Sequence, residues 1–118
     1  DIFTFWLEKD ADGFLISDVS NPFEGDSSNS SEKKVDLMKK IREHIDTWSS
    51  SNNSPRKLLM ADAWLPDDEL LPYYEAGVIP LNFRLIGSIE GSVTAGDIKF
   101  LIESWSKVLP EKAVTNWP

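Results

Sequence analysis

The run Lys57-Leu58-Leu59-Met60-Ala61 decides the fold class of this chain. Four apolar residues follow Lys57 without a break, which is typical of a strand buried on both faces of a parallel sheet. Phe14 to Val19 also reads as a short strand, because Asn21-Pro22 ends its apolar run. We expect a third strand within Val78 to Ile86, since Pro80 is tolerated near the start of a strand.

Helical patterns separate these predicted strands. Apolar residues recur at steps of three and four in one helix, namely at Val35, Met38, Ile41, Ile45 and Trp48. A short helix opens at Pro66 with three acidic residues in its first turn. Thr94 and Asp97 cap the last helix, and Pro110 ends it. Its apolar stripe consists of Ile98, Leu101, Ile102, Trp105, Val108 and Leu109. Together with a first helix over Ile2 to Lys9, this alternation predicts an α/β fold with a parallel sheet.

The composition narrows the possible functions. A net charge of −8 argues against nucleic acid and anionic membranes as partners, because both need a basic surface. The chain has no cysteine, so a disulfide framework and a thiolate metal site are excluded. We expect one domain segment over residues 1–118, with no metal and no cofactor. No apolar run has the roughly 20 residues of a membrane span. The start at Asp1, without an initiator Met, suggests a processed or excised segment.

The candidate site lies at the carboxyl ends of the predicted strands, where parallel α/β folds carry function. These positions are held by Ser17, Asp18, Asp62, Trp64 and the stretch Asn82 to Arg84. Because side chains alternate along a strand, we expect Ser17 and Asp18 to point to opposite faces. Asp18 would then share the face of Phe14 and Ile16. Asp62 has a plain alternative role as the cap of a loop.

An ordered set of short stretches runs along almost the whole chain. They are Phe5-Trp6-Leu7, Asp12-Gly13-Phe14, Leu58-Leu59-Met60-Ala61-Asp62-Ala63-Trp64, Tyr73-Tyr74, Pro80-Leu81-Asn82-Phe83, Trp105, Leu109-Pro110 and Asn116-Trp117. In this order and approximate spacing the chain resembles the α-glucosidase branch of the α-amylase superfamily. That branch includes the heavy chains of heteromeric amino acid transporters. The resemblance implies a partial (β/α)8 barrel, covering about strands four to six with their helices.

The resemblance also implies where catalysis would occur. The hydrolases carry their nucleophile in a stretch like Asp-Gly-Phe-Arg-Ile-Asp-Ala, where this chain has Leu15 for the Arg and Ser17 for the nucleophile. Asp18 comes one position late, and only a local bulge would bring it to the site. Asp62 stands for the acid/base Glu and is one methylene shorter, a misplacement that can cost about a hundredfold in rate. The third carboxylate of the family lies beyond the matched stretch. We therefore expect no working glycosidase.

Aromatic residues and sequons complete the list of candidates. Trp64 and the pair Tyr73-Tyr74 are candidates for stacking on sugars, although packing is the favoured role. We expect the tryptophans on the helix stripes to lie in the core, namely Trp6, Trp48 and Trp105. Asn29 and Asn52 match the glycosylation pattern in predicted loops, although Pro55 weakens the second match.

Two functions follow from these observations. The first is a non-catalytic, extracellular or cell-surface scaffold from a transporter heavy chain, with a membrane light chain or the remaining barrel segments as partners. The alternative is a segment of a divergent retaining α-glucosidase (maltase) in carbohydrate metabolism. Three strands leave open sheet edges and an uncovered face, so we expect the isolated chain to self-associate.

Overall fold

The computed structural model describes residues 1–19, 31–88 and 91–117. Helices and strands alternate along most of the chain. Their order is α1 (Ile2–Leu7), β1 (Gly13–Ile16), α2 (Ser31–Ser51), β2 (Leu58–Ala61), α3 (Asp67–Glu75), β3 (Ile79–Pro80), α4 (Arg84–Ser88) and α5 (Ala95–Val108). Most of the loop predicted around residues 24–31, including Asn29, lies outside the described residues.

The three strands form one parallel sheet in the order β1-β2-β3. Phe14 pairs with Leu59 and Ile16 with Ala61, while Met60 of β2 pairs with Ile79 of β3. Strands that follow each other in the chain are therefore neighbours in the sheet. This confirms the predicted parallel α/β class and is compatible with consecutive strands of a (β/α)8 barrel. A closed barrel is not formed by these three strands.

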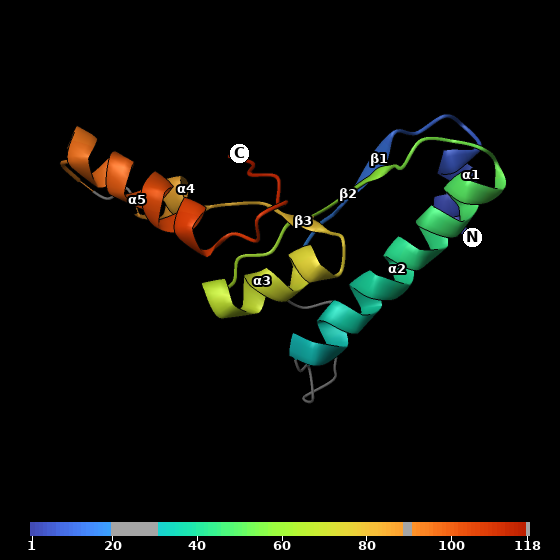
Figure 1. Ribbon diagram of the computed structural model, residues 1–118, viewed down its shortest axis with the longest axis horizontal. Coiled ribbons are helices and arrows are strands. Elements are labelled where there is room, and N and C mark those ends of the chain that lie inside the picture. Colours follow the sequence, from blue (N-terminus) through green and yellow to red (C-terminus); the bar gives the residue numbers. More distant parts are fainter. Residues whose placement is uncertain (20–30, 89–90, 118) are drawn as a thin grey trace.

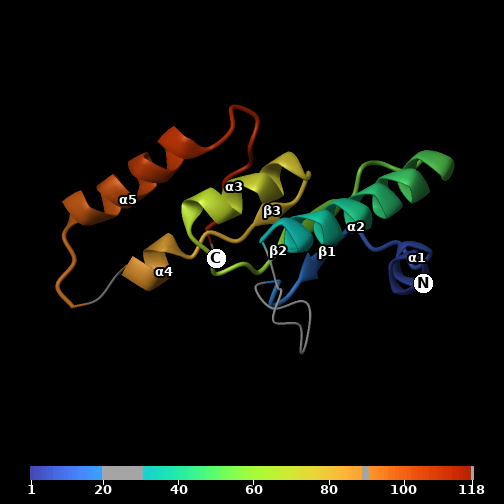
Figure 2. The same cartoon turned by 90° about the horizontal axis from the view of Figure 1, so that it is seen from below.

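One face of the sheet is covered and the other is open. Leu59 and Ala61 are buried, and Phe14 and Ile16 pack against the same core. The helices add their stripes to it, through Val35, Met38 and Ile45 of α2 and Leu70 and Tyr73 of α3. Figures 1 and 2 show α2 and α3 beside the strands, with α4 and α5 beyond β3. On the opposite face Leu15 and Leu58 are 54% and 56% exposed.

The chain is more extended than a compact domain of its size. Its radius of gyration is 16.1 Å, whereas a compact domain of this length has about 13.5 Å. The outer helix α5 explains part of the difference, because half of its predicted apolar stripe is exposed. Trp105 is fully buried, but Ile98 and Ile102 are 39% and 40% exposed. The predicted capping box of Thr94 and Asp97 is present at the start of this helix.

The third strand lies within Val78 to Ile86, as expected, but β3 covers only Ile79–Pro80 because the chain turns into α4 at Arg84. The reason is a local bond: Asn82 Oδ1 accepts from the Arg84 N–H at 3.2 Å and turns the chain into the helix. Trp6 was expected in the core and is 50% exposed, whereas Trp48 packs partly buried against the core.

Candidate functional site

The carboxyl edge of the sheet contains an irregularity between β1 and β2. The Asp62 N–H donates to the Ile16 carbonyl at 2.8 Å, as a parallel ladder requires. A regular ladder would next bring the N–H of residue 18 to the Asp62 carbonyl. Instead the Val19 N–H donates there, at 3.2 Å. Asp18 is the extra residue, and its φ of 51° lies in the left-handed region, which Asp tolerates better than most residues.

This bulge changes the face on which the following residues lie. Val19 is 1% exposed and belongs to the core, so it takes the position that simple alternation assigns to Asp18. Ser17 and Asp18 are both exposed. The prediction that Asp18 shares the covered face of Phe14 and Ile16 is therefore wrong. The alternation rule fails here because it assumes one residue per ladder position, and the bulge adds one.

The two carboxylates of this edge have no partner in the part of the chain that the structure describes. Asp62 is half-buried directly after β2, and Asp18 is exposed after β1. Neither carboxylate has a hydrogen bond or ion pair to another described residue, so the capping role considered for Asp62 is not observed there.

An aromatic platform lies next to Asp62. Trp64 stacks on Phe83 with ring centroids 4.8 Å apart and an angle of 17° between the planes. A Cβ on Gly87 would lie 2.9 Å from the Trp64 ring, so the ring rests against the backbone of α4 at that point. Trp64 is nevertheless 60% exposed. Because Phe83 covers one face of the indole, the other face is the one that can receive a sugar ring.

A pocket of about 210 Å³ opens beside this platform. Its wall consists of Ala63, Trp64, Leu65, Asp67, Leu70, Leu81, Asn82, Phe83, Arg84, Gly87 and Ser88. Two buried donors have no partner among the described residues, namely Nδ2 of Asn82 and Nη1 of Arg84. Unpaired buried donors are costly, so a small shift of either side chain that turns its donor toward an acceptor oxygen in this pocket would be favourable.

Arg84 is held in place by its neighbours. Its guanidinium lies 4.0 Å from the centroid of the buried Trp105 ring and donates through Nη2 to the Asp67 carboxylate. Burial lowers the pKa of Arg84, but an arginine starts so high that it stays charged at neutral pH. Sequence reasoning placed Asn82 to Arg84 near the site but gave them no role, since their unpaired donors depend on tertiary burial.

Two other candidates from the sequence, Tyr73 and Asn52, lie away from this pocket. Tyr73 is 1% exposed and packs in the core, as the favoured packing role requires, so its ring is not placed to stack on a sugar. Burial, with a smaller contribution from Glu69, raises the pKa of Tyr73. Asn52 is exposed just after α2, and its Nδ2 donates to the Trp48 carbonyl at 2.8 Å.

No group of three or more acidic or histidine side chains that could hold a metal ion occurs within residues 1–19, 31–88 and 91–117. Within these same ranges, no helix is long and apolar enough to cross a membrane.

The parallel α/β sheet is compatible with part of a (β/α)8 barrel, and several curated α-glucosidases are similar to this chain. No family model matches the chain. Maltase A1 from Drosophila melanogaster is 26% identical, over 98% of this chain and 26% of the relative. Alpha-glucosidase from Apis mellifera is 21% identical over 98% of this chain and 24% of the relative, and Salivary alpha-glucosidase from Anopheles gambiae is 20% identical over 98% and 25%. These relatives support a place in the α-glucosidase superfamily and give no support to a transporter heavy chain.

The chain spans about a quarter of the length of these curated relatives. The alignment with Maltase A1 runs over 152 residues, more than the 118 residues of this chain. The relative therefore has additional residues within the matched stretch.

Proposed function

We propose that this chain forms the central strand-end part of the saccharide site of an α-glucosidase-related protein that hydrolyses α-linked glucosides. One observation supports this most directly: the bulge removes Asp18 from the covered face and leaves it exposed at the same sheet edge as Asp62. The maltase and α-glucosidase names of the relatives support this substrate class.

The chemistry requires two carboxylates on either side of the glycosidic bond. In a retaining mechanism they lie about 5–5.5 Å apart, a distance that side chains at the ends of two neighbouring strands can span. In our proposal the Asp18 carboxylate attacks the anomeric carbon and forms a glucosyl ester. Asp62 donates its proton to the leaving oxygen, then accepts a proton from the water that hydrolyses the ester. Asp18 is released as a carboxylate.

The remaining groups would hold the sugar. The open face of Trp64 suits the apolar face of a pyranose ring, and the unpaired donors of Asn82 and Arg84 suit hydroxyl oxygens. Ser17 is exposed beside Asp18 and needs a base partner to be a nucleophile. The one histidine of the sequence, His44, contacts Asp1 and Thr4 instead.

A second candidate is a glycosidase-like scaffold that binds sugars without hydrolysis. It is favoured by Ser17 and Leu15, which replace the expected nucleophile and its arginine support, and by the short acid Asp62. Such a scaffold would join the remaining barrel segments or a membrane light chain. The open face at Leu15 and Leu58 supports association in either case, including self-association of the isolated chain.

The proposal also includes an extracellular location for the chain and a glycan on Asn52. One relative is named a salivary enzyme, which favours secretion and an extracellular place for this chain. An extracellular chain could carry a glycan at Asn52, which is exposed after α2. Mass spectrometry before and after treatment with a glycosidase that removes N-linked glycans tests this, and an unmodified Asn52 peptide from the secreted protein would contradict it.

The decisive experiment measures hydrolysis of maltose and an aryl α-glucoside by the full polypeptide that contains this chain. We expect Asp18→Asn to lower kcat at least about 10³-fold, because a nucleophile is removed. Asp62→Asn should lower it strongly as well, and Ser17→Ala should leave it within about threefold. A covalent glucosyl adduct on Asp18, trapped with a fluorinated glucoside, would identify the nucleophile directly.

The controls separate the two candidates. If the wild-type polypeptide binds α-glucosides but shows no turnover, the scaffold is correct and the hydrolase is not. If Ser17→Ala abolishes turnover while Asp18→Asn does not, both the role of Asp18 and the meaning of the bulge are refuted. Asp12→Asn is a matched control, because Asp12 is an exposed acid at the other end of β1.

A further inference from the structure

A second pocket lies at the amino ends of the strands, at the opposite end of the sheet from the saccharide site. It has a volume of about 260 Å³ and is formed where β2 and β3 begin. Its lining residues are Arg42, Arg56, Lys57, Leu58, Leu59, Tyr74, Gly77, Val78, Ile79, Lys112 and Val114. Four of them are basic and none is acidic, in a chain whose net charge is −8.

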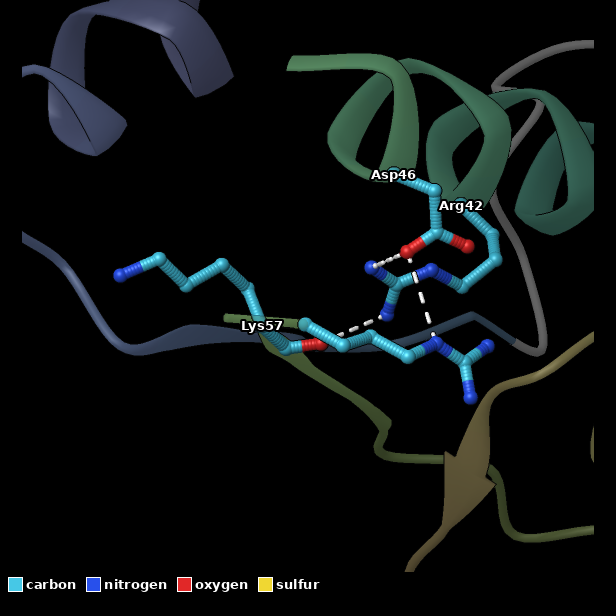
Figure 3. Close-up of polar contacts among 4 residues, drawn as sticks. Arg42, Asp46 and Lys57 are labelled. Atoms are coloured by element: carbon cyan, nitrogen blue, oxygen red, sulfur yellow. Dashed lines mark hydrogen bonds and ion pairs between the residues drawn. The ribbon is translucent and has the colours of Figure 1, made fainter. Parts of the chain in front are cut away.

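Arg42 anchors this pocket from α2. It is 5% exposed, and its Nη1 donates to the Lys57 carbonyl at 2.8 Å while Nη2 donates to Asp46 at 2.6 Å. Figure 3 shows the guanidinium held between Asp46 and the backbone at Lys57. Its third nitrogen, Nε, is buried without a partner among the described residues. Arg42 is therefore a buried cation at the wall of a pocket that has no acidic lining residue, which suits an anion.

Gly77 lets a second arginine approach the same place. Its φ is 75°, and a Cβ there would lie 2.8 Å from Arg56 Nη2 and 3.2 Å from Arg42 Cδ. Without a side chain at this position, both arginines lie against the turn before β3. Arg56 also contacts Asp46, with Nε 3.4 Å from the carboxylate.

The charges around the pocket do not cancel. Asp46 lies between the two arginines, and the Lys57 ammonium is 3.6 Å from the Asp12 carboxylate. These two carboxylates neutralise two of the four positive charges. In Figure 3 the Lys57 ammonium points away from Arg42 and Asp46. Lys112 has no partner in the described part of the chain. Two positive charges remain, around an opening that is large enough for a small oxyanion.

We propose that this pocket binds a phosphate group, free or as an ester, through Arg56 and Lys112 with the buried Arg42 as its anchor. Arginine offers a planar fork and lysine a point charge, and both are common phosphate ligands. The site is separate from the saccharide site and does not depend on it, because its groups come from the amino edge of the sheet.

The test uses the full polypeptide in buffer of low ionic strength, with inorganic phosphate as the probe. Isothermal titration should give a Kd on the order of 1 mM for phosphate, while sodium chloride at equal ionic strength gives no comparable heat. Lys112→Gln should weaken phosphate binding about tenfold, and Arg56→Gln by at least as much. Lys40→Gln is the matched control: Lys40 is exposed on α2, does not line the pocket, and its loss changes the net charge equally.

Each outcome bears on the proposal. Loss of binding in the two pocket variants, with normal binding by Lys40→Gln, supports it. Equal weakening in all three variants would show that only net charge matters and would overturn it, as would equal responses to phosphate and chloride. Hydrolysis of α-glucosides should be unchanged in Lys112→Gln, so failure here leaves the saccharide site untouched.

Discussion

The two ends of the same small sheet carry opposite chemistry. At the carboxyl edge, Asp18 lies in a backbone bulge beside the end of β2, and neither its carboxylate nor that of Asp62 has a partner among the described residues. At the amino edge, Arg42 is buried and bonded to both Asp46 and the backbone. The comparison shows that charged side chains with a structural role are buried and paired, whereas those that a ligand can reach are at least partly exposed and have no partner among the described residues. The amino edge contains both kinds, since Lys112 is exposed and Arg42 is buried.

The largest expected effect comes from breaking the structural part of the amino edge. Arg42→Met keeps the volume and apolar stem but removes the donors to Lys57 and Asp46. We expect a loss of about 2–3 kcal/mol in the free energy of unfolding, because a buried carbonyl loses its donor and Asp46 loses its nearest cation. Urea unfolding followed by circular dichroism measures this.

The matched control is Arg56→Met, because Arg56 contacts the same carboxylate from an exposed position. We expect a loss of less than about 0.5 kcal/mol there. Equal losses in the two variants would show that burial does not distinguish these arginines.

The second effect is the pH dependence of stability that comes from Tyr74 at the amino edge. Burial raises the pKa of Tyr74 to about 12 from its ordinary 10. The folded state therefore holds the Tyr74 proton more tightly than the unfolded state does. The contribution of the protonated hydroxyl to the free energy of unfolding is fully present below pH 10 and is lost as the pH rises from 10 to 12. Ultraviolet titration near 295 nm should show tyrosine ionisation above pH 11 in the folded chain.

Tyr74→Phe should flatten the fall of stability between pH 10 and pH 12, since it removes the titrating hydroxyl. The Tyr74 hydroxyl makes only a long bond of 3.4 Å to the Val114 carbonyl, so the cost at neutral pH is small. Tyrosine ionisation at pH 10 in the folded chain would contradict the argument.

The smallest expected effect is the change in stability when Asp18 in the bulge is replaced. Asp18→Ala places an ordinary residue in the left-handed region and should cost about 1 kcal/mol, whereas Asp18→Gly should be neutral or stabilising by up to about 1 kcal/mol. Thermal melts of the two variants provide the measurement. If alanine and glycine behave alike, residue 18 does not have a positive φ in solution and the bulge is absent.

Much of the fold follows from the sequence. The parallel strands at Phe14 and Leu59, the long α2 and the capped α5 follow from apolar periodicity and local hydrogen bonds, which are short-range properties. The short length of β3 and the helix α4 could not be predicted, because they depend on the bond from the Arg84 N–H to the Asn82 side chain, and competing local bonds of this kind are weak signals in a sequence. Burial of Tyr73 rather than Tyr74 was not fixed by their pattern, since the two are adjacent.

For the candidate site, the sequence determined which groups exist: a serine at position 17, acids at 18 and 62, and a tryptophan at 64. It also determined that these groups follow strands, and hence that they meet at one edge. The tertiary structure decided which face Asp18 occupies, because that depends on a hydrogen bond from Val19 to Asp62, across more than forty residues of chain. The basic pocket was likewise decided by packing, because Arg42, Gly77 and Lys112 come together only when α2, the turn before β3 and the C-terminal segment are in place.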